Sequence, residues 1–427
     1  MAVTASPSTA LDRISYDDLY ARWERGNWRA TEIDFREDRV QWHERFSALQ
    51  RDAALWNYAL FFHGEDHVAD DLSPYIEAAP REEQKYFLAT QQVDEARHAI
   101  FFSRFMREVA GVDGAGVGDQ LGATRPQLTW GFRQIFERLD RMADELRKDR
   151  SRAKLAQAVT LYHVVVEASL AQPGQHFIES YLDDRDLLPG FRSGMANVAL
   201  DEQRHIGFGV KLLADLREED PDGVPHAVAE ILREAIPWTA AVLIPPDWDL
   251  RYTECFGFTL EDIGEEGARS LETKLRSAGL AVDTLPGPQI FDTSLTPREQ
   301  ARRGNALVRG GFLGEKLGPP SREPAFAELV FDTLRRSVDH RAAPAYPTIL
   351  QWDFTDFEPW HLRIDDGATA AVRGRAPAPD LTFRISWEDW VDLAAERLDP
   401  RRALVTRRLR PKGDLRLFLR LPKLFGS

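Results

Sequence analysis

Apolar residues recur at helical spacing through the first two thirds of the chain. The pattern predicts helices over about 41–72, 82–109, 128–148, 152–182, 191–216 and 226–242. Turn-forming residues separate them, as at Ser73-Pro74 and Leu188-Pro189-Gly190. The segment Gly111–Gly122 is rich in glycine and could be mistaken for a dinucleotide-binding loop, but no strand precedes it. We interpret it as a long connection that is not helical.

The pattern changes after about residue 325, where short segments separated by turn residues replace the long helical ones. It predicts strands over 348–354, 361–364, 369–375 and 381–386, with helices over 325–340 and 387–397. The region 286–324, which precedes these elements and contains several prolines, is predicted to be a linker with one short helix. Because 427 residues exceed what one core usually serves, we predict three parts: a bundle over 1–285, a linker over 286–324 and a small α+β domain over 325–427.

Charge and composition support this division and exclude several classes of protein. The net charge is −14, but residues 325–427 carry +2 and the preceding ones −16. An acidic chain is not typical of a nucleic-acid-binding protein. The lone Cys255 excludes an internal disulfide and a cysteine-based metal site. The N-terminal residues do not resemble a signal peptide and no apolar run is long enough to span a membrane, so we expect a cytoplasmic protein.

Two segments of the predicted bundle repeat one pattern of acidic and histidine residues. Glu95 and His98 lie within Asp-Glu-Ala-Arg-His, and Glu202 and His205 lie within Asp-Glu-Gln-Arg-His. Residues three apart share one face of a helix, so the Glu and His of each pair can reach the same metal ion. One such pair arises by chance on a surface helix. Two pairs, each followed by an apolar run, indicate a metal site.

Two further glutamates complete the pattern of a dinuclear site in a four-helix bundle, which takes one Glu from each of the other two helices. Glu167 lies in the nearly apolar segment 161–170, where burial of an unpaired carboxylate would cost several kcal/mol. Glu65 lies just past another apolar run. Taken singly, Glu65 could be a solvated helix residue and Glu167 a buried partner of an arginine. Together with the repeated pairs they predict two metal ions held by four carboxylates and two imidazoles.

The ligand types narrow the choice of metal and suggest supporting residues. Carboxylates combined with imidazoles suit iron or manganese. Asp94 and Asp201 precede the two Glu-x-x-His pairs, and we predict that they orient the histidines, although a plain salt bridge to a neighbouring arginine is a comparable alternative. The other histidines of the bundle are more typical of polar or capping residues than of ligands: His63, His67, His163 and His176.

These residues resemble a known family, the ligand-binding oxidases related to the small subunit of ribonucleotide reductase. The resemblance covers about the first 285 residues, including the segments Tyr20–Trp28 and Thr31–Phe35, and the metal residues match in order and spacing. It implies a ferritin-like bundle with a mixed manganese–iron cofactor, or alternatively two iron ions, that reacts with dioxygen. It also implies a long-chain fatty acid lying against the cofactor. We further expect a homodimer and an electron donor whose identity is unknown.

Two core positions sharpen this resemblance. Family members carry a valine three residues after the first metal-binding Glu and a tyrosine five residues before the third, and here these are Val68 and Tyr162. In the family the two side chains become joined by an ether bond, so the resemblance implies a Val68–Tyr162 cross-link. On their own, both are ordinary core residues.

The C-terminal part resembles the sterol-carrier-protein fold, a small α+β domain with an apolar tunnel. The segments that carry this resemblance are Trp352–Phe354, His361–Ile364 and Trp387–Trp390. Residues 401–427 hold nine Lys+Arg, one acidic residue and several large apolar residues. This composition suits contact with acyl chains, anionic head groups or an acidic surface, or else the segment only closes its own domain and docks on the acidic bundle.

We therefore expect a mainly α protein: a ferritin-like bundle with a dinuclear metal site, followed by a small sterol-carrier-like domain. Its predicted function is that of an oxygen-activating oxidase or oxygenase that binds or acts on a long-chain lipid or acyl-type ligand. One alternative is a di-iron hydroxylase or N-oxygenase of a biosynthetic pathway. Another is a non-catalytic lipid carrier whose bundle stores metal or scaffolds the C-terminal domain.

Overall fold

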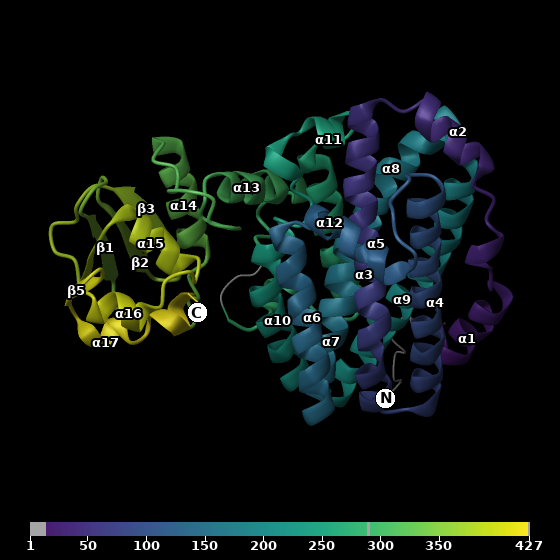
Figure 1. Ribbon diagram of the computed structural model, residues 1–427. Coiled ribbons are helices and arrows are strands. Elements are labelled where there is room, and N and C mark those ends of the chain that lie inside the picture. Colours follow the sequence, from purple (N-terminus) through teal and green to yellow (C-terminus); the bar gives the residue numbers. More distant parts are fainter. Residues whose placement is uncertain (1–13, 288–290, 426–427) are drawn as a thin grey trace, which may run out of the picture. The chain divides into compact units, whose positions relative to one another are not determined.

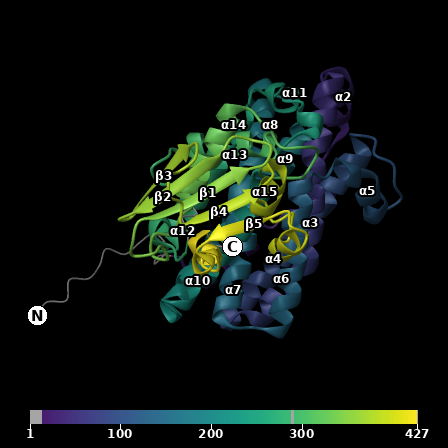
Figure 2. The ribbon, with the colours of Figure 1, turned by 90° about the vertical axis from the view of Figure 1, so that its left-hand side faces the viewer.

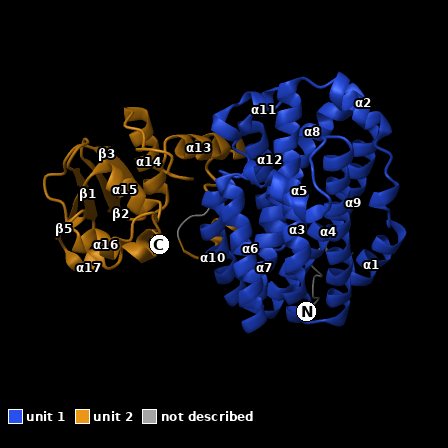
Figure 3. Ribbon diagram, viewed as in Figure 1, with its two compact units in different colours: residues 1–281 blue, residues 282–427 orange. Residues whose placement is uncertain are grey.

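The computed structural model describes residues 14–287 and 291–425 and shows long helices followed by a small sheet (Figure 1). Residues 1–13, where the absence of a signal peptide was inferred, lie outside the described part. The chain forms two compact units, Met1–Ala281 and Val282–Ser427 (Figure 3). None of the helices in the described part combines the length and the apolar character needed to cross a membrane.

Unit 1 is built from helices that run alongside one another. The longest are α3 (Ala48–Ala78), α4 (Glu82–Glu108) and α9 (Pro189–Glu219). Ser47 begins α3 with a capping box, since its side chain accepts from the Gln50 backbone and Gln50 reciprocates. The remaining α-helices of the unit are α1 (Tyr16–Arg25), α2 (Arg36–Glu44), α5 (Val117–Thr124), α6 (Trp130–Lys148), α7 (Arg152–Val159), α8 (Gln172–Arg185), α10 (Gly223–Thr239), α11 (Arg251–Glu254) and α12 (Leu260–Ser277).

The helix predicted over 152–182 contains a long π-helical segment, η4 (Thr160–Ala171), between α7 and α8. Its residues from Thr160 to Ala168 are all buried, including Tyr162 and Glu167. A π-helical turn holds more residues than an α-helical turn, and such turns are frequent at functional sites. The change of pitch decides which side chains of this buried segment face the centre of the bundle.

Several local predictions were wrong. The break at Ser73-Pro74 does not exist, because α3 continues through Pro74 to Ala78 and buries Pro74 and Tyr75. The glycine-rich connection contains α5, which begins after Gly116 and buries Gln120 and Thr124. The helix α12 was not predicted. In each case tertiary packing outweighs the local preference of proline, glycine or charged residues.

Unit 2 contains a five-stranded sheet with the order β3-β2-β1-β4-β5 (Figure 2). The strands β1 and β4 pair in parallel and all other neighbours are antiparallel. The predicted strands are present, and β5 lies in the basic C-terminal stretch, where none was predicted. The elements are α13 (Pro297–Arg309), α14 (Pro324–Arg336), β1 (Thr348–Phe354), β2 (Trp360–Asp365), β3 (Ala368–Arg373), β4 (Leu381–Ile385), α15 (Trp387–Ala394), α16 (Pro400–Val405), β5 (Arg410–Gly413), α17 (Leu415–Phe418) and α18 (Leu421–Phe425).

Aromatic side chains form the centre of unit 2. The ring of Phe331 stacks on those of Trp360 and Trp390, with ring centroids 4.7 and 5.1 Å apart. Leu307 and Phe312, from the region predicted as a linker, also belong to this core. The predicted class, a mainly helical bundle followed by a small α+β domain, is confirmed. The boundaries 1–285, 286–324 and 325–427 stay a prediction about independently folding domains.

Candidate metal centre

The six residues predicted to bind metal come together inside unit 1 from four separate segments. Glu65 lies on α3, Glu95 and His98 on α4, Glu167 on η4, and Glu202 and His205 on α9, and all six are buried. They form two groups, and within each group one possible ligand atom from every residue lies within 4.8 Å of the others. The groups are Glu65, Glu95, His98 and Glu202, and Glu95, Glu167 and His205.

The first group surrounds the Nδ1 atom of His98. This nitrogen lies 3.2 Å from Oε2 of Glu65, 3.4 Å from Oε2 of Glu95 and 3.6 Å from Oε1 of Glu202. Three carboxylates from three helices therefore converge on one imidazole nitrogen.

The second group surrounds the Nδ1 atom of His205 in the same manner. This nitrogen lies 3.1 Å from Oε1 of Glu95, 3.7 Å from Oε1 of Glu167 and 3.8 Å from Oε2 of Glu202. Glu95 and Glu202 thus direct one oxygen toward each histidine. The glutamate of each Glu-x-x-His pair lies between the two histidines, which the spacing within one helix could not reveal.

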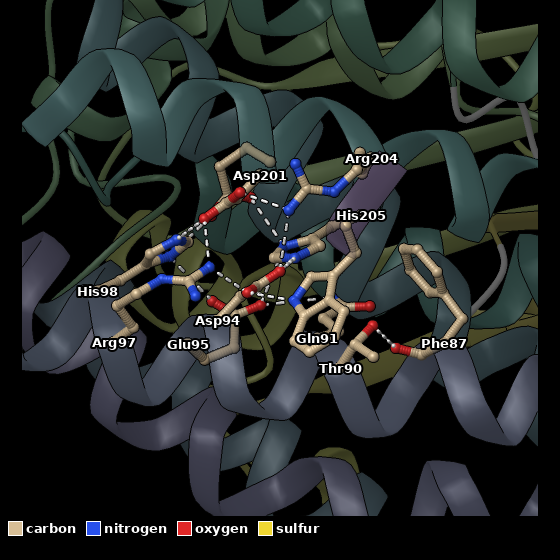
Figure 4. Close-up of polar contacts among 12 residues, drawn as sticks. Phe87, Thr90, Gln91, Asp94, Glu95, Arg97, His98, Asp201, Arg204 and His205 are labelled. Atoms are coloured by element: carbon tan, nitrogen blue, oxygen red, sulfur yellow. Dashed lines mark hydrogen bonds and ion pairs between the residues drawn. The ribbon is translucent and has the colours of Figure 1, made fainter. Parts of the chain in front are cut away.

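The opposite nitrogen of each histidine contacts an aspartate on the other helix. Nε2 of His98 lies 3.1 Å from Oδ2 of Asp201, and Nε2 of His205 lies 3.1 Å from Oδ2 of Asp94 (Figure 4). Because a carboxylate accepts a proton, Nε2 carries the hydrogen and the lone pair of Nδ1 faces the glutamates. A lone pair facing carboxylate oxygens is repelled unless a cation or a proton lies between them. The arrangement therefore suits a metal ion bound at each Nδ1.

Arginines and tryptophans hold the two aspartates in place. Arg97 and Arg204 each form ion pairs with both Asp94 and Asp201, so that the charges of this layer balance. Nε1 of Trp23 donates to Asp94 at 2.8 Å. In the same way, Nε1 of Trp28 donates to Asp201 at 2.8 Å. The two tryptophan contacts were not predictable from the sequence, because the partners are 71 and 173 positions apart.

Burial and mutual repulsion make three of the four glutamates, Glu65, Glu167 and Glu202, difficult to ionise without a cation, whereas at Glu95 the two histidines outweigh burial and lower the pKa. Burial, together with neighbouring carboxylates, raises the pKa of Glu65 and Glu167 well above the usual range. Burial opposes a charge on His98, but the charge of Glu65 and the hydrogen bonds to Asp201, Glu65 and Glu95 together outweigh it and raise the pKa of His98. Among the six candidate ligands, three buried side-chain atoms have no hydrogen-bond partner: Oε2 of Glu167, Oε2 of Glu202 and Nδ1 of His205. Such atoms are costly unless they bind a ligand, so the donor set fits a pair of cations.

Gln91, one turn before Glu95 on α4, connects the glutamates to Tyr162. Its Nε2 donates to Oε1 of Glu167 at 2.9 Å and to the Tyr162 hydroxyl at 3.0 Å, while the hydroxyl donates to Oε1 of Glu95 at 2.6 Å. Its Oε1 lies 3.2 Å from Nε2 of His163, and burial lowers the pKa of His163 to about 3, so this imidazole is neutral. Gln91 was not predicted to belong to the site. The one feature of the sequence that could have indicated it is its position four residues before Glu95, on the same face of the helix.

A cavity lies beside the glutamates. Its volume of about 70 Å³ exceeds the roughly 10–15 Å³ that one water molecule needs. Val68 and Tyr162 both line it, and so do four of the six predicted metal residues. The rest of the wall is almost wholly apolar: Leu60, Phe61, Phe132, Phe136, Val166, Leu170, Ala171, Val242 and Leu243, with Asn57 and Gly64.

Comparison with solved structures identifies the fold of unit 1. The R2-like ligand-binding oxidase from Sulfolobus acidocaldarius is 24% identical, with a TM-score of 0.53 over 70% of this chain and 99% of that chain. A variant of an R2-like ligand-binding oxidase with an anaerobically reconstituted Mn/Fe cofactor is 23% identical, with a TM-score of 0.54 over 63% of this chain and 94% of that chain.

Comparison with protein families agrees with this likeness. Residues 10–242, more than half of the chain, match the small chain of ribonucleotide reductase. Residues 331–426 match the SCP-2 sterol transfer family. Both resemblances noted in the sequence are thereby confirmed. The chain belongs to the ribonucleotide reductase small-chain family and carries a C-terminal SCP-2 sterol transfer domain.

Proposed function

We propose that this protein is an oxygen-activating oxidase whose dinuclear site holds manganese and iron, or two iron ions. The observation that carries the proposal is the orientation of His98 and His205. Their Nε2 atoms face aspartates while their Nδ1 atoms face the glutamates, an arrangement suited to two cations. The Mn/Fe cofactor of the solved relatives supports the choice of metals.

The distances suggest a role for each ligand. Glu65 and His98 would hold one ion and Glu167 and His205 the other. Glu95 and Glu202, which each approach both histidines, would contribute to holding both ions. When bound in their reduced state, two redox-active metal ions would supply electrons to dioxygen. Asp94 and Asp201 keep the imidazoles in the tautomer that binds metal.

We propose that Val68 and Tyr162 become joined by an ether bond. A bond would form between Cβ of Val68 and the phenolic oxygen of Tyr162, with the loss of one hydrogen from each. The two electrons and two protons go to dioxygen. Tyr162 already donates its hydroxyl proton toward Oε1 of Glu95, which is positioned to accept it. Both side chains line the same cavity beside the glutamates.

The ligand of this cavity would be a long-chain lipid or acyl compound, such as a fatty acid. Its wall is apolar except at the glutamates, Tyr162 and Asn57, which suits an acyl chain with a polar end near the metals. We propose that the C-terminal domain, a relative of sterol transfer proteins, captures such ligands for the bundle.

Oxygen uptake and mass spectrometry test the proposal together. The reduced, metal-loaded protein should consume dioxygen, and its tryptic digest should contain a Val68–Tyr162 peptide pair two hydrogens lighter than its parts. Tyr162→Phe should lack this pair. Tyr75→Phe, a change to a neighbouring buried tyrosine whose ring centroid is 5.9 Å away, should keep it.

Two other results would favour the alternatives. Oxygen uptake without the linked peptide would indicate a hydroxylase or N-oxygenase. No oxygen uptake by the fully loaded protein would contradict an oxidase and favour a lipid carrier with a structural metal site.

A further inference from the structure

The last elements of unit 2 form a continuous segment on its surface, which we call the basic C-terminal segment (residues 401–425). It contains α16 without its first residue, the edge strand β5, α17 and α18. Figure 1 labels α16, β5 and α17 in unit 2. Four buried apolar side chains attach it to the core of the unit: Ala403, Leu409, Leu417 and Leu424. The segment therefore has a fixed outer side.

The charge of this outer side is almost wholly positive. The segment has nine Lys+Arg and one acidic residue, Asp414, whose side chain accepts from the backbone at the start of α17. Arg408 forms an ion pair with Asp389. The other eight basic residues are exposed and form no ion pair within the described parts of the chain: Arg401, Arg402, Arg407, Arg410, Lys412, Arg416, Arg420 and Lys423.

Large apolar side chains are exposed between these charges. Val405 is 85% exposed, Leu419 77% and Leu415 59%. Outside this segment, only Leu317 among the described residues is a large apolar residue exposed to the same degree as Leu419, at 77%. Since exposure of apolar area costs about 25 cal/mol per Å², such side chains in a basic surface indicate a partner that also offers apolar contact.

We propose that the basic C-terminal segment binds the surface of an anionic phospholipid bilayer. Phosphate head groups complement the eight unpaired cations, and the acyl region just below them accepts Val405, Leu415 and Leu419. Nucleic acid would complement the charge but leave these side chains in water. An acidic protein surface would need pockets for three separate apolar side chains. The proposal does not depend on the metal site or on its reaction.

Vesicle sedimentation with the full-length chain tests this proposal. The protein should sediment with vesicles of phosphatidylcholine plus phosphatidylserine and remain in solution with phosphatidylcholine alone. Arg416→Glu/Arg420→Glu should lower the vesicle partition constant at least about tenfold, because each basic residue near an anionic surface contributes about 1 kcal/mol. Leu415→Ser/Leu419→Ser should abolish the binding that persists at high salt, because salt screens the charges and leaves apolar insertion.

The control is a charge reversal of equal size elsewhere. Arg39→Glu/Arg363→Glu changes two exposed arginines, on α2 and β2, that form no ion pair within the described residues, and it should leave vesicle binding unchanged. Equal loss in the control and in the segment variant would overturn the proposal. So would binding that ignores phosphatidylserine, or no vesicle binding by the wild-type chain.

Discussion

Unit 1 places ionisable residues at its centre, whereas unit 2 fills its centre with aromatic rings. In unit 1, the four glutamates and two histidines of the candidate metal centre, with the two aspartates that contact these histidines, are almost completely shielded from solvent. In unit 2, Phe331 lies between Trp360 and Trp390. The interior of unit 1 contains carboxylates and imidazoles that lack enough hydrogen-bond partners within the protein. The interior of unit 2 consists mainly of aromatic rings that pack against one another.

A buried glutamine in each unit shows the same difference. Gln351 of unit 2 donates to the Trp352 and Trp360 carbonyls and accepts from the Ala376 amide, so its partners all belong to the backbone. Gln91 of unit 1 instead donates to side chains of the site, the Tyr162 hydroxyl and a carboxylate oxygen of Glu167. Gln351 therefore supports the backbone of its own unit, whereas Gln91 supports the side chains of the candidate site.

The largest expected effect is a loss of folding stability in unit 2 that leaves unit 1 unchanged. Phe331→Ala should destabilise unit 2 by about 3–5 kcal/mol, because it removes the ring at the centre of the aromatic stack. Urea unfolding followed by fluorescence should show the transition of unit 2 at lower denaturant, with metal content unchanged. Tyr346→Ala, which removes an exposed ring, should have little effect. Loss of metal from Phe331→Ala would mean that the two interiors are not independent.

The next effect weakens metal binding without removing a ligand. Asp201→Asn should lower metal affinity about 10–100-fold, because the amide no longer fixes the tautomer of His98 or balances Arg97. Competition with a chelator measures the affinity. Asp38→Asn is the matched control: Asp38 is also a buried aspartate of unit 1, but it bonds to the Gly190 and Phe191 amides. The prediction fails if both variants bind metal equally well.

A smaller effect concerns Gln91. Gln91→Leu should cost about 1–3 kcal/mol of stability and lower the yield of the Val68–Tyr162 peptide, because Tyr162 and Glu167 lose a shared donor. Metal content should stay the same. Gln92→Leu changes the next residue, which donates to the Ala69 carbonyl on the side of α3, and should keep the yield. Equal yields in the two variants would exclude a positioning role for Gln91.

The smallest effect is a dependence of stability on pH. The raised pKa of Glu65 and Glu167 means that these groups keep protons in the folded, metal-free chain that the unfolded chain releases above about pH 4.3. Stability of the metal-free protein should therefore fall as pH rises from about 5 to about 8, and the raised pKa of His98 acts in the same direction.

Metal ions replace these protons, so the increase in Tm on metal loading should grow over that pH range. Thermal unfolding of loaded and metal-free protein at several pH values measures it. An increase that stays constant with pH would contradict the assignment of these carboxylates to the metals.

The sequence predicted the candidate ligands because their pattern is local. Each Glu-x-x-His pair spans a single helical turn, and the apolar surroundings of Glu167 are visible in the chain itself. That Asp94 contacts the histidine of α9 and Asp201 the histidine of α4 was not predictable, since these contacts depend on how the two helices pack. The π-helix was not predictable either, because the almost uninterrupted apolar run around Val165 has no period that distinguishes one helical pitch from another.

Metal stoichiometry tests the central claim most directly. Purified protein loaded with manganese and iron, then freed of excess metal, should hold two equivalents of transition metal per chain by elemental analysis. His98→Ala and His205→Ala should each hold clearly less, because each removes the nitrogen on which three carboxylates converge. His163→Ala, a change to a buried histidine that bonds to Gln91, should still hold two. Two equivalents in both ligand variants would contradict the dinuclear site proposed for this bundle.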